Sequence, residues 1–109
     1  MIHVPVLSRS PRAVSKEQAL ITPRFELGRT VITRNAHMTL NGFDVRASIW
    51  RHLAGDWGDL CPEDKAANDR ALRDKSRILS VYTDRWGNTF WIITEWDRSY
   101  TTVLLPEDY

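Results

Sequence analysis

Residues 77–109 read RILSVYTDRWGNTFWIITEWDRSYTTVLLPEDY, and this stretch decides the fold. β-Branched and aromatic residues fill three short runs, at residues 78–82, 89–94 and 100–105, whereas Gly, Asn, Asp and Ser gather in the two segments between them. This alternation is typical of strands joined by tight turns. The sequence therefore predicts a three-stranded meander at the C-terminal end of the chain.

The middle run, residues 89–94, is apolar on both faces of the predicted strand. Successive side chains of a strand point to opposite faces, so Phe90 and Ile92 share one face while Trp91 and Ile93 share the other. A strand with one wet face alternates apolar and polar residues instead. We therefore expect this strand to be central and covered on both faces, with helices covering at least one of them.

The chain upstream predicts one more strand and two or three helices. A strand is expected over residues 25–33. Start and stop signals then favour a short helix over residues 35–40, which ends at Asn41-Gly42, and a second helix over residues 44–53. A third helix is expected from Pro62, because proline is favoured in the first turn of a helix.

The sequence divides at about residue 24. Residues 25–109 predict a single α+β domain: a mainly antiparallel sheet of about four strands with two to three helices packed on it. Residues 1–24 predict a basic, flexible N-terminal arm, in which residues 3–7 are a candidate edge strand. One interpretation of the arm is a nucleic acid contact through its basic side chains, which are Arg9, Arg12, Lys16 and Arg24.

Composition excludes several classes of protein. The formal net charge is +1, which fits neither an acidic mimic of DNA nor a strongly basic nucleic-acid binder. The charge is uneven, since residues 1–34 carry six basic and two acidic side chains. Cys61 has no partner for an intrachain disulfide, and no apolar run approaches the roughly 20 residues of a membrane span. We expect a cytoplasmic protein without a membrane segment; its oligomeric state is left open.

No motif of the sequence indicates a metal, a cofactor or a catalytic residue. The three histidines are scattered and lack the spacing of metal ligands, and no glycine-rich phosphate loop is present. One catalytic hypothesis is a small metal-independent nuclease, with Glu95 as base, His52 as acid and Arg98 on the phosphate. The competing structural interpretation is that residues 97–99 make a turn and Glu95 pairs with a basic neighbour.

Five tryptophans in so small a domain point to aromatic recognition. Some of them can seal the open ends of the sheet, but Trp and Arg near turns are also the residue types that dominate binding hot spots. The sequence therefore predicts a partner-binding surface, formed by Trp57, Trp86, Arg85, Asp97, Arg98, Tyr100, His52 and Asp56.

Two signatures, Gly55-Asp56-Trp57-Gly58 and Asp97-Arg98-Ser99-x-Thr101-Thr102, resemble those of a family of small bacterial proteins carried on plasmids and integrative conjugative elements. Members are often labelled plasmid-related protein. The resemblance spans about residues 27–109. It implies an accessory role on mobile DNA, a setting in which small proteins are often anti-CRISPR or anti-restriction inhibitors.

We therefore expect a non-enzymatic inhibitor that binds a protein complex of a bacterial defence system. Two alternatives stay open. The first is the small nuclease or toxin that uses Glu95, His52 and Arg98. The second is a nucleic-acid-binding accessory protein whose basic arm contacts phosphate.

Overall fold

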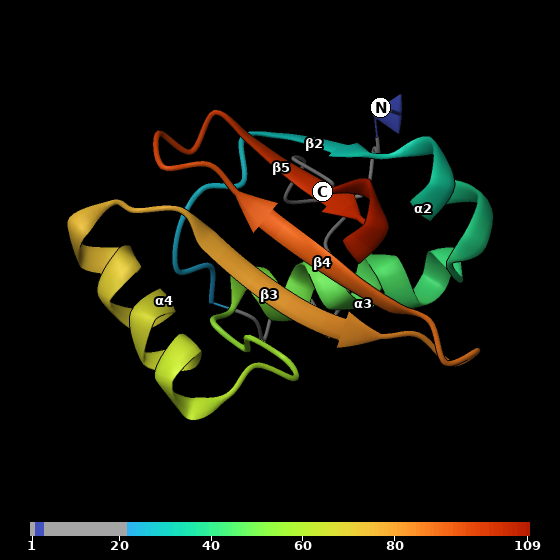
Figure 1. Ribbon diagram of the computed structural model, residues 1–109. Helices are drawn as coiled ribbons and strands as arrows, with labels where there is room; N and C mark the ends of the chain where they lie inside the picture. The colour runs from blue at the N-terminus through green and yellow to red at the C-terminus, as the bar shows by residue number, and fades with distance from the viewer. Residues whose placement is uncertain (1, 4–21) are drawn as a thin grey trace.

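The computed structural model describes residues 2–3 and 22–109. Its centre is a five-stranded sheet in the order β1-β2-β5-β4-β3 (Figure 1). Strand β2 runs parallel to β5, and every other neighbouring pair is antiparallel. The α+β fold and the C-terminal meander are confirmed. The strands are β1 (Ile2–His3), β2 (Arg29–Ile32), β3 (Ile78–Thr83), β4 (Thr89–Thr94) and β5 (Tyr100–Leu104).

Most of the predicted arm lies outside the described residues. Of residues 1–24 the structure describes only Ile2–His3, which pairs with β2, and residues 22–24. Arg24 is exposed, and its backbone N–H donates to the carbonyl of Leu53 over 2.9 Å. The flexibility of the arm and the roles of Arg9, Arg12 and Lys16 also fall outside the described residues.

Among the described residues, three α-helices and a short 3-10 helix complete the fold. The prediction that Asn41-Gly42 only ends the first helix was incomplete, because Asn41 also begins the next one. Its side chain accepts a hydrogen bond from the backbone of Asp44, which makes Asn41 the N-cap. The third helix begins at Pro62, as predicted. The helices are α2 (Arg34–Thr39), α3 (Gly42–Leu53), α4 (Pro62–Asp74) and η2 (Pro106–Asp108).

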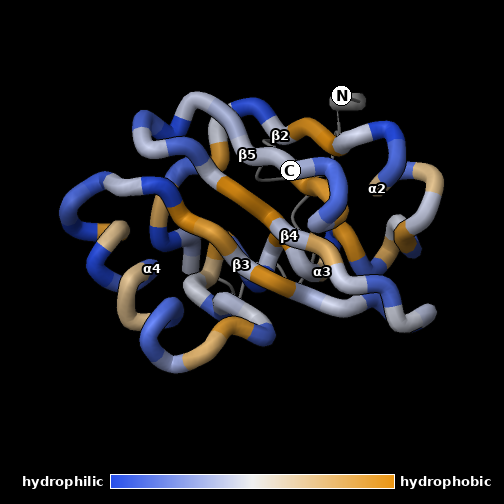
Figure 2. Tube along the Cα trace, viewed as in Figure 1, coloured by the Kyte–Doolittle hydropathy of each residue, from blue (hydrophilic) through white to orange (hydrophobic). Residues whose placement is uncertain are grey.

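Helix α3 covers one face of the sheet (Figure 1). On that face the β4 side chains of Phe90, Ile92 and Thr94 are fully buried. Helix α3 contributes Val45 and Ile49 to the same core, and Figure 2 shows apolar residues running along β3 and β4. This layer of sheet against helix is the main core of the described chain.

Among the described residues the other face of the sheet carries no helix other than η2, so within residues 22–109 helices cover β4 on one face only. Trp91 lies on this open face and is only partly buried, with its ring centroid 5.6 Å from that of Tyr109. Ile93, also on this face, is nevertheless buried. The apolar residues on this face shield one another in place of a helix.

This arrangement predicts a moderate cost for truncating Trp91. We expect Trp91→Ala to lower the free energy of unfolding by about 2 kcal/mol, less than the roughly 3–5 kcal/mol of a fully buried aromatic side chain. The reason is that part of the ring already contacts water in the folded state. Urea unfolding followed by far-UV circular dichroism measures the change. A loss above about 3 kcal/mol would mean that something covers the open face.

The outward edge of β3 is closed by the loop before α4 and by α4 itself. Val81 of β3 exchanges backbone hydrogen bonds with this loop, accepting from the N–H of Asp59 over 2.7 Å and donating to the carbonyl of Trp57 over 3.2 Å. The side-chain amide of Asn68 bonds both the N–H and the carbonyl of Leu79. These contacts leave little of this edge open to pairing with another strand.

No helix among the described residues is long and apolar enough to cross a membrane.

Candidate functional site

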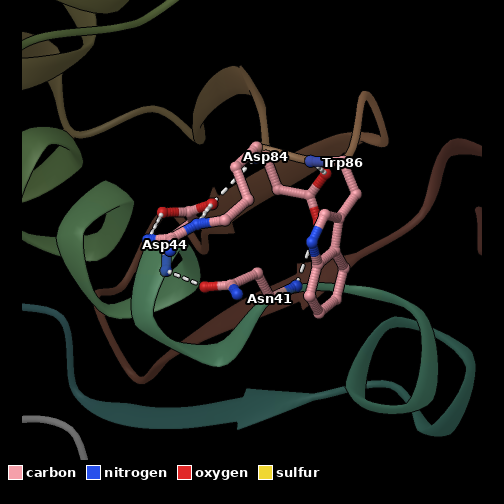
Figure 3. A network of polar contacts seen from close by, with 5 residues as sticks. Asn41, Asp44, Asp84 and Trp86 are labelled. Atoms are coloured by element: carbon pink, nitrogen blue, oxygen red, sulfur yellow. Dashed lines mark hydrogen bonds and ion pairs between the residues drawn. The ribbon is translucent and has the colours of Figure 1, made fainter.

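A carboxylate network ties the β3–β4 turn to the start of α3 (Figure 3). Asp84, the first residue after β3, is buried and has both carboxylate oxygens occupied. One oxygen accepts from the backbone N–H groups of Trp86 and Asn88, over 3.0 and 2.8 Å. The other accepts from the backbone N–H of Asn41 over 2.9 Å and from the side-chain amide of Asn88 over 3.3 Å. A single side chain therefore fixes both the turn and the α2–α3 junction.

A second carboxylate strengthens the same junction. Asp44, in the first turn of α3, binds Arg85 through both of its oxygens, with the guanidinium at 2.9 and 3.0 Å and the backbone N–H of Arg85 at 2.8 Å. A bidentate pair of this kind restricts orientation more than an ordinary surface ion pair. The position of Arg85 is thus set by α3 as well as by its own turn.

These hydrogen bonds keep both carboxylates ionised. Burial alone raises the pKa of Asp84, but the hydrogen bonds from Asn41, Asn88 and Trp86 outweigh it, and the pKa lies below its usual value. The side-chain and backbone hydrogen bonds from Arg85 lower the pKa of Asp44. The network therefore keeps its charge state at neutral pH.

The elements that this network joins carry three exposed large apolar side chains. Met38 on α2 is 75% exposed, Phe43 on α3 is 71% exposed and Trp86 in the β3–β4 turn is 64% exposed. The guanidinium of Arg85 lies over the ring of Phe43, 5.6 Å from its centroid. We call these three residues, Met38, Phe43 and Trp86, the Trp86 surface. Large apolar side chains held out into solvent on a rigid base are typical of a docking site.

The residues predicted around Arg98 lie at the opposite end of the sheet. Trp86 precedes β4 and Arg98 follows it, and six strand residues span about 20 Å. Tyr100 and Trp96 are exposed at this far end, where Asp97 bonds the N–H of Ser99. The structure therefore does not bring Trp86 and Arg85 together with Asp97, Arg98 and Tyr100 in one cluster.

The contacts of Arg98 are structural. Its backbone is left-handed, with φ of 59°, and its guanidinium donates to three backbone carbonyls. Those of Ser76, Ala71 and Glu95 lie at 2.6, 2.9 and 3.0 Å. Arg98 therefore fastens the β4–β5 turn to the C-terminal end of α4.

Trp57 and Asp56 also have structural positions. Trp57 is 3% exposed and its indole N–H donates to Asp69 over 3.0 Å, so its predicted place on a binding surface was wrong. Asp56 pairs with Arg51 over 2.7 Å, and its backbone carbonyl accepts from the hydroxyl of Tyr82. The Gly-Asp-Trp-Gly signature thus anchors the loop that closes the β3 edge.

His52 lies inside the core rather than on a surface. It is fully buried, with Nδ1 2.5 Å from the Ser80 hydroxyl and Nε2 2.9 Å from the Thr94 hydroxyl. Thr94 in turn lies 2.7 Å from Thr101, whose hydroxyl donates to the carbonyl of Leu27. The predicted role of His52 in partner binding is not compatible with this depth.

The chain of hydroxyl groups determines the tautomer of His52. Thr101 has one hydroxyl proton and uses it on the Leu27 carbonyl, so Thr94 must donate to Thr101. Thr94 then has no proton left for His52 and accepts from Nε2–H. Ser80 donates to the unprotonated Nδ1. Burial, with a smaller contribution from the charge of Arg98, lowers the pKa of His52 to about 3, so the ring is neutral.

The nuclease hypothesis gains no geometric support. His52 bonds Thr94, which faces the helix-covered side of β4, whereas the next residue, Glu95, points to the open face. Glu95 pairs there with Arg77 over 3.3 Å. Acid, base and phosphate-binding groups therefore do not converge on one site. Within the described ranges, no group of three or more His, Cys, Asp or Glu residues is placed to hold a metal ion.

Sequence reasoning missed Met38 and Phe43, because an amphipathic pattern does not reveal which apolar residue fails to find a core. A signal existed at Asn41-Gly42, where two helices meet beside a residue as large as Phe43.

Comparison of the chain with family models, with curated proteins and with solved structures finds no match.

Proposed function

We propose that this chain is a non-enzymatic binding protein that docks on another protein through the Trp86 surface. The observation that supports the proposal is the exposure of Met38, Phe43 and Trp86 over a support with no unsatisfied carboxylate oxygen. A rigid surface loses little conformational entropy on binding, so the burial of these side chains contributes more fully to affinity. Hot spots are enriched in tryptophan for this reason.

The target in this proposal is a cytoplasmic complex of a bacterial defence system, which the chain inhibits by occupying part of its surface. The support is the resemblance of the two signatures to proteins carried on mobile DNA. Binding that blocks a target requires affinity and position but no chemistry on the inhibitor. A surface of apolar anchors without a convergent set of acid, base and phosphate-binding groups suits that task.

The proposal predicts a loss of inhibition on truncation of Trp86. Bacteria that carry one defined CRISPR or restriction system are transformed with a targeted plasmid, with and without this protein. We expect the wild-type protein to restore transformation in the strain with the susceptible system and Trp86→Ala to restore little. Hot-spot truncation costs about 2 kcal/mol or more, which is roughly a thirtyfold loss of affinity.

Trp96→Ala is the matched control. Trp96 is the same residue type and is 65% exposed, against 64% for Trp86, but it lies at the other end of the sheet. We expect this variant to inhibit like the wild type, and both variants to melt at nearly the wild-type temperature. Equal inhibition by Trp86→Ala and the wild type, or equal failure of the two variants, would refute the Trp86 surface as the docking site.

A further inference from the structure

The dipeptide Asn41-Gly42 at the junction of α2 and α3 is chemically reactive. Asn41 is the only asparagine of the sequence that a glycine follows, the others being Asn35, Asn68 and Asn88. A backbone nitrogen can attack the side-chain amide of the asparagine before it, and glycine leaves that nitrogen unhindered because it has no Cβ. The sequence therefore makes Asn41 the asparagine most prone to deamidation.

The reaction needs only water. Hydroxide removes the proton of the Gly42 N–H, and the nitrogen forms a bond to Cγ of Asn41. The bond from Cγ to Nδ2 breaks, and the amide leaves as ammonia with a proton taken from water, which restores the hydroxide. Water then opens the five-membered imide at either of its carbonyls and gives aspartate or isoaspartate. One water is consumed, one ammonia is released, and nothing is oxidised or reduced.

The folded backbone of Asn41 holds the reacting atoms apart. Ring closure requires the Gly42 nitrogen and Cβ of Asn41 to lie on the same side of the Cα–C bond of Asn41, in a near-attack geometry. Asn41 has φ of −71° and ψ of 119°, which turns the nitrogen away from Cβ. A rotation of ψ must therefore precede the attack, and that rotation reorients α3 relative to α2.

Three contacts oppose this rotation. Oδ1 of Asn41 accepts from the backbone N–H of Asp44 over 3.0 Å, and the backbone N–H of Asn41 donates to Asp84 over 2.9 Å (Figure 3). The ion pair between Asp44 and Arg85, at 2.9 Å, ties the start of α3 to the β3–β4 turn. The junction must release at least part of this network before Gly42 can reach Cγ.

We infer that Asn41 is a latent deamidation site, which the capping and carboxylate contacts of the α2–α3 junction keep closed and which reacts only when that junction opens. The inference does not depend on the proposed function. Parts of a fold open locally, without unfolding of the whole chain. The rate of deamidation in the folded protein therefore reports how often this junction opens.

Neither product restores the native junction. Isoaspartate adds a methylene to the backbone between the N–H that Asp84 accepts and the first turn of α3. Aspartate is the milder product, because it keeps a capping oxygen, but it places a third carboxylate beside Asp44 and Asp84, where like charges repel. We expect the modified protein to melt at a lower temperature than the unmodified one.

Peptide mapping by mass spectrometry tests the site. The protein is incubated at alkaline pH, either folded or unfolded in guanidinium, and is then digested with trypsin. Cleavage after Arg34 and Arg46 gives one peptide that contains both Asn35 and Asn41, so Asn35 is an internal control. We expect Asn41 to react fastest of the asparagines in the unfolded chain, and at least about tenfold more slowly in the folded protein.

Variants separate the dipeptide from the junction. Gly42→Ala should slow the reaction of the unfolded chain about tenfold by steric hindrance, and in the fold its Cβ would meet nothing within 4 Å. Asp44→Ala removes the pair with Arg85 and should speed the folded-state reaction about fivefold, with no change in the unfolded chain. Asp56→Ala, which breaks the pair with Arg51 at the other end of α3, is the matched control. Circular dichroism verifies that the variants are folded.

Three results would overturn the inference. The first is a reaction at Asn41 in the unfolded chain that is no faster than at Asn35. The second is an equal rate in the folded and unfolded protein, which would mean that the junction does not restrain Asn41. The third is an Asp44→Ala variant that reacts no faster in the folded state than Asp56→Ala.

Discussion

Gly58→Ala is expected to lower the free energy of unfolding by about 3 kcal/mol or more, with loss of the close contact between the loop before α4 and strand β3. Gly58 has φ of +74°, and a Cβ atom there would lie 1.9 Å from the carbonyl oxygen of Val81 and 2.8 Å from the ring of Tyr82. Neither the Val81 carbonyl nor the Tyr82 ring can move away easily. The Val81 carbonyl accepts from Asp59, and Tyr82 is buried with its hydroxyl bonded to Asp56.

Gly87→Ala separates steric clash from backbone strain. Gly87 has φ of +86°, but a Cβ atom there would meet nothing within 4 Å. Only the cost of a left-handed non-glycine residue remains, about 1–2 kcal/mol. Urea unfolding of both variants, followed by circular dichroism, measures the difference. Equal losses of unfolding free energy in the two variants would show that the loop at Gly58 can shift away from β3 without further cost.

The structural roles of Gly58, Trp57 and Arg98 bear on the family resemblance. Gly58 permits the approach of the loop, Trp57 fills the space beneath it, and Arg98 fastens α4. Both signatures therefore have structural roles. We propose that partner specificity lies in other residues, those of the Trp86 surface.

The second large effect is a loss of stability in mild acid through His52. In the folded state the pKa of His52 is about 3, and in the unfolded chain it returns to the ordinary value near 6.5. Between these values the unfolded state binds more protons, so stability falls as the pH is lowered through this window. We expect a loss of about 2 kcal/mol between pH 7 and pH 5, and about 4–5 kcal/mol by pH 3.

The pH range of this loss distinguishes His52 from the carboxylates. Carboxylates with lowered pKa values, such as Asp44 and Asp84, lose their contribution only below about pH 4. His52→Gln keeps a donor and an acceptor but does not titrate, so its stability should change little between pH 7 and pH 5. His37→Gln, at an exposed histidine, is the control and should keep the wild-type slope.

Urea unfolding at several pH values measures the slopes. A wild-type slope that persists in His52→Gln would contradict the assignment. Nitrogen-15 NMR of the imidazole provides a second measurement, in which we expect the Nε2–H tautomer at neutral pH.

Local chemistry in the sequence determined the secondary structure well. The C-terminal strands, the helix that begins at Pro62 and the α+β class all follow from side-chain alternation, turn residues and capping, which act between near neighbours. The same reasoning placed Trp86 in a turn and in a binding role, and the structure leaves Trp86 exposed. The binding role stays a prediction.

Only the tertiary structure decided how these elements combine. Periodicity showed that β4 is apolar on both faces, but not that α3 covers the face of Phe90 and leaves that of Trp91 open. It did not predict the buried hydroxyl groups that hydrogen-bond to both ring nitrogens of His52 and so allow a histidine in the core. Nor did it reveal that Trp86 and Arg98 lie at opposite ends of the sheet. Each of these depends on contacts between residues distant in the chain, which no local pattern encodes.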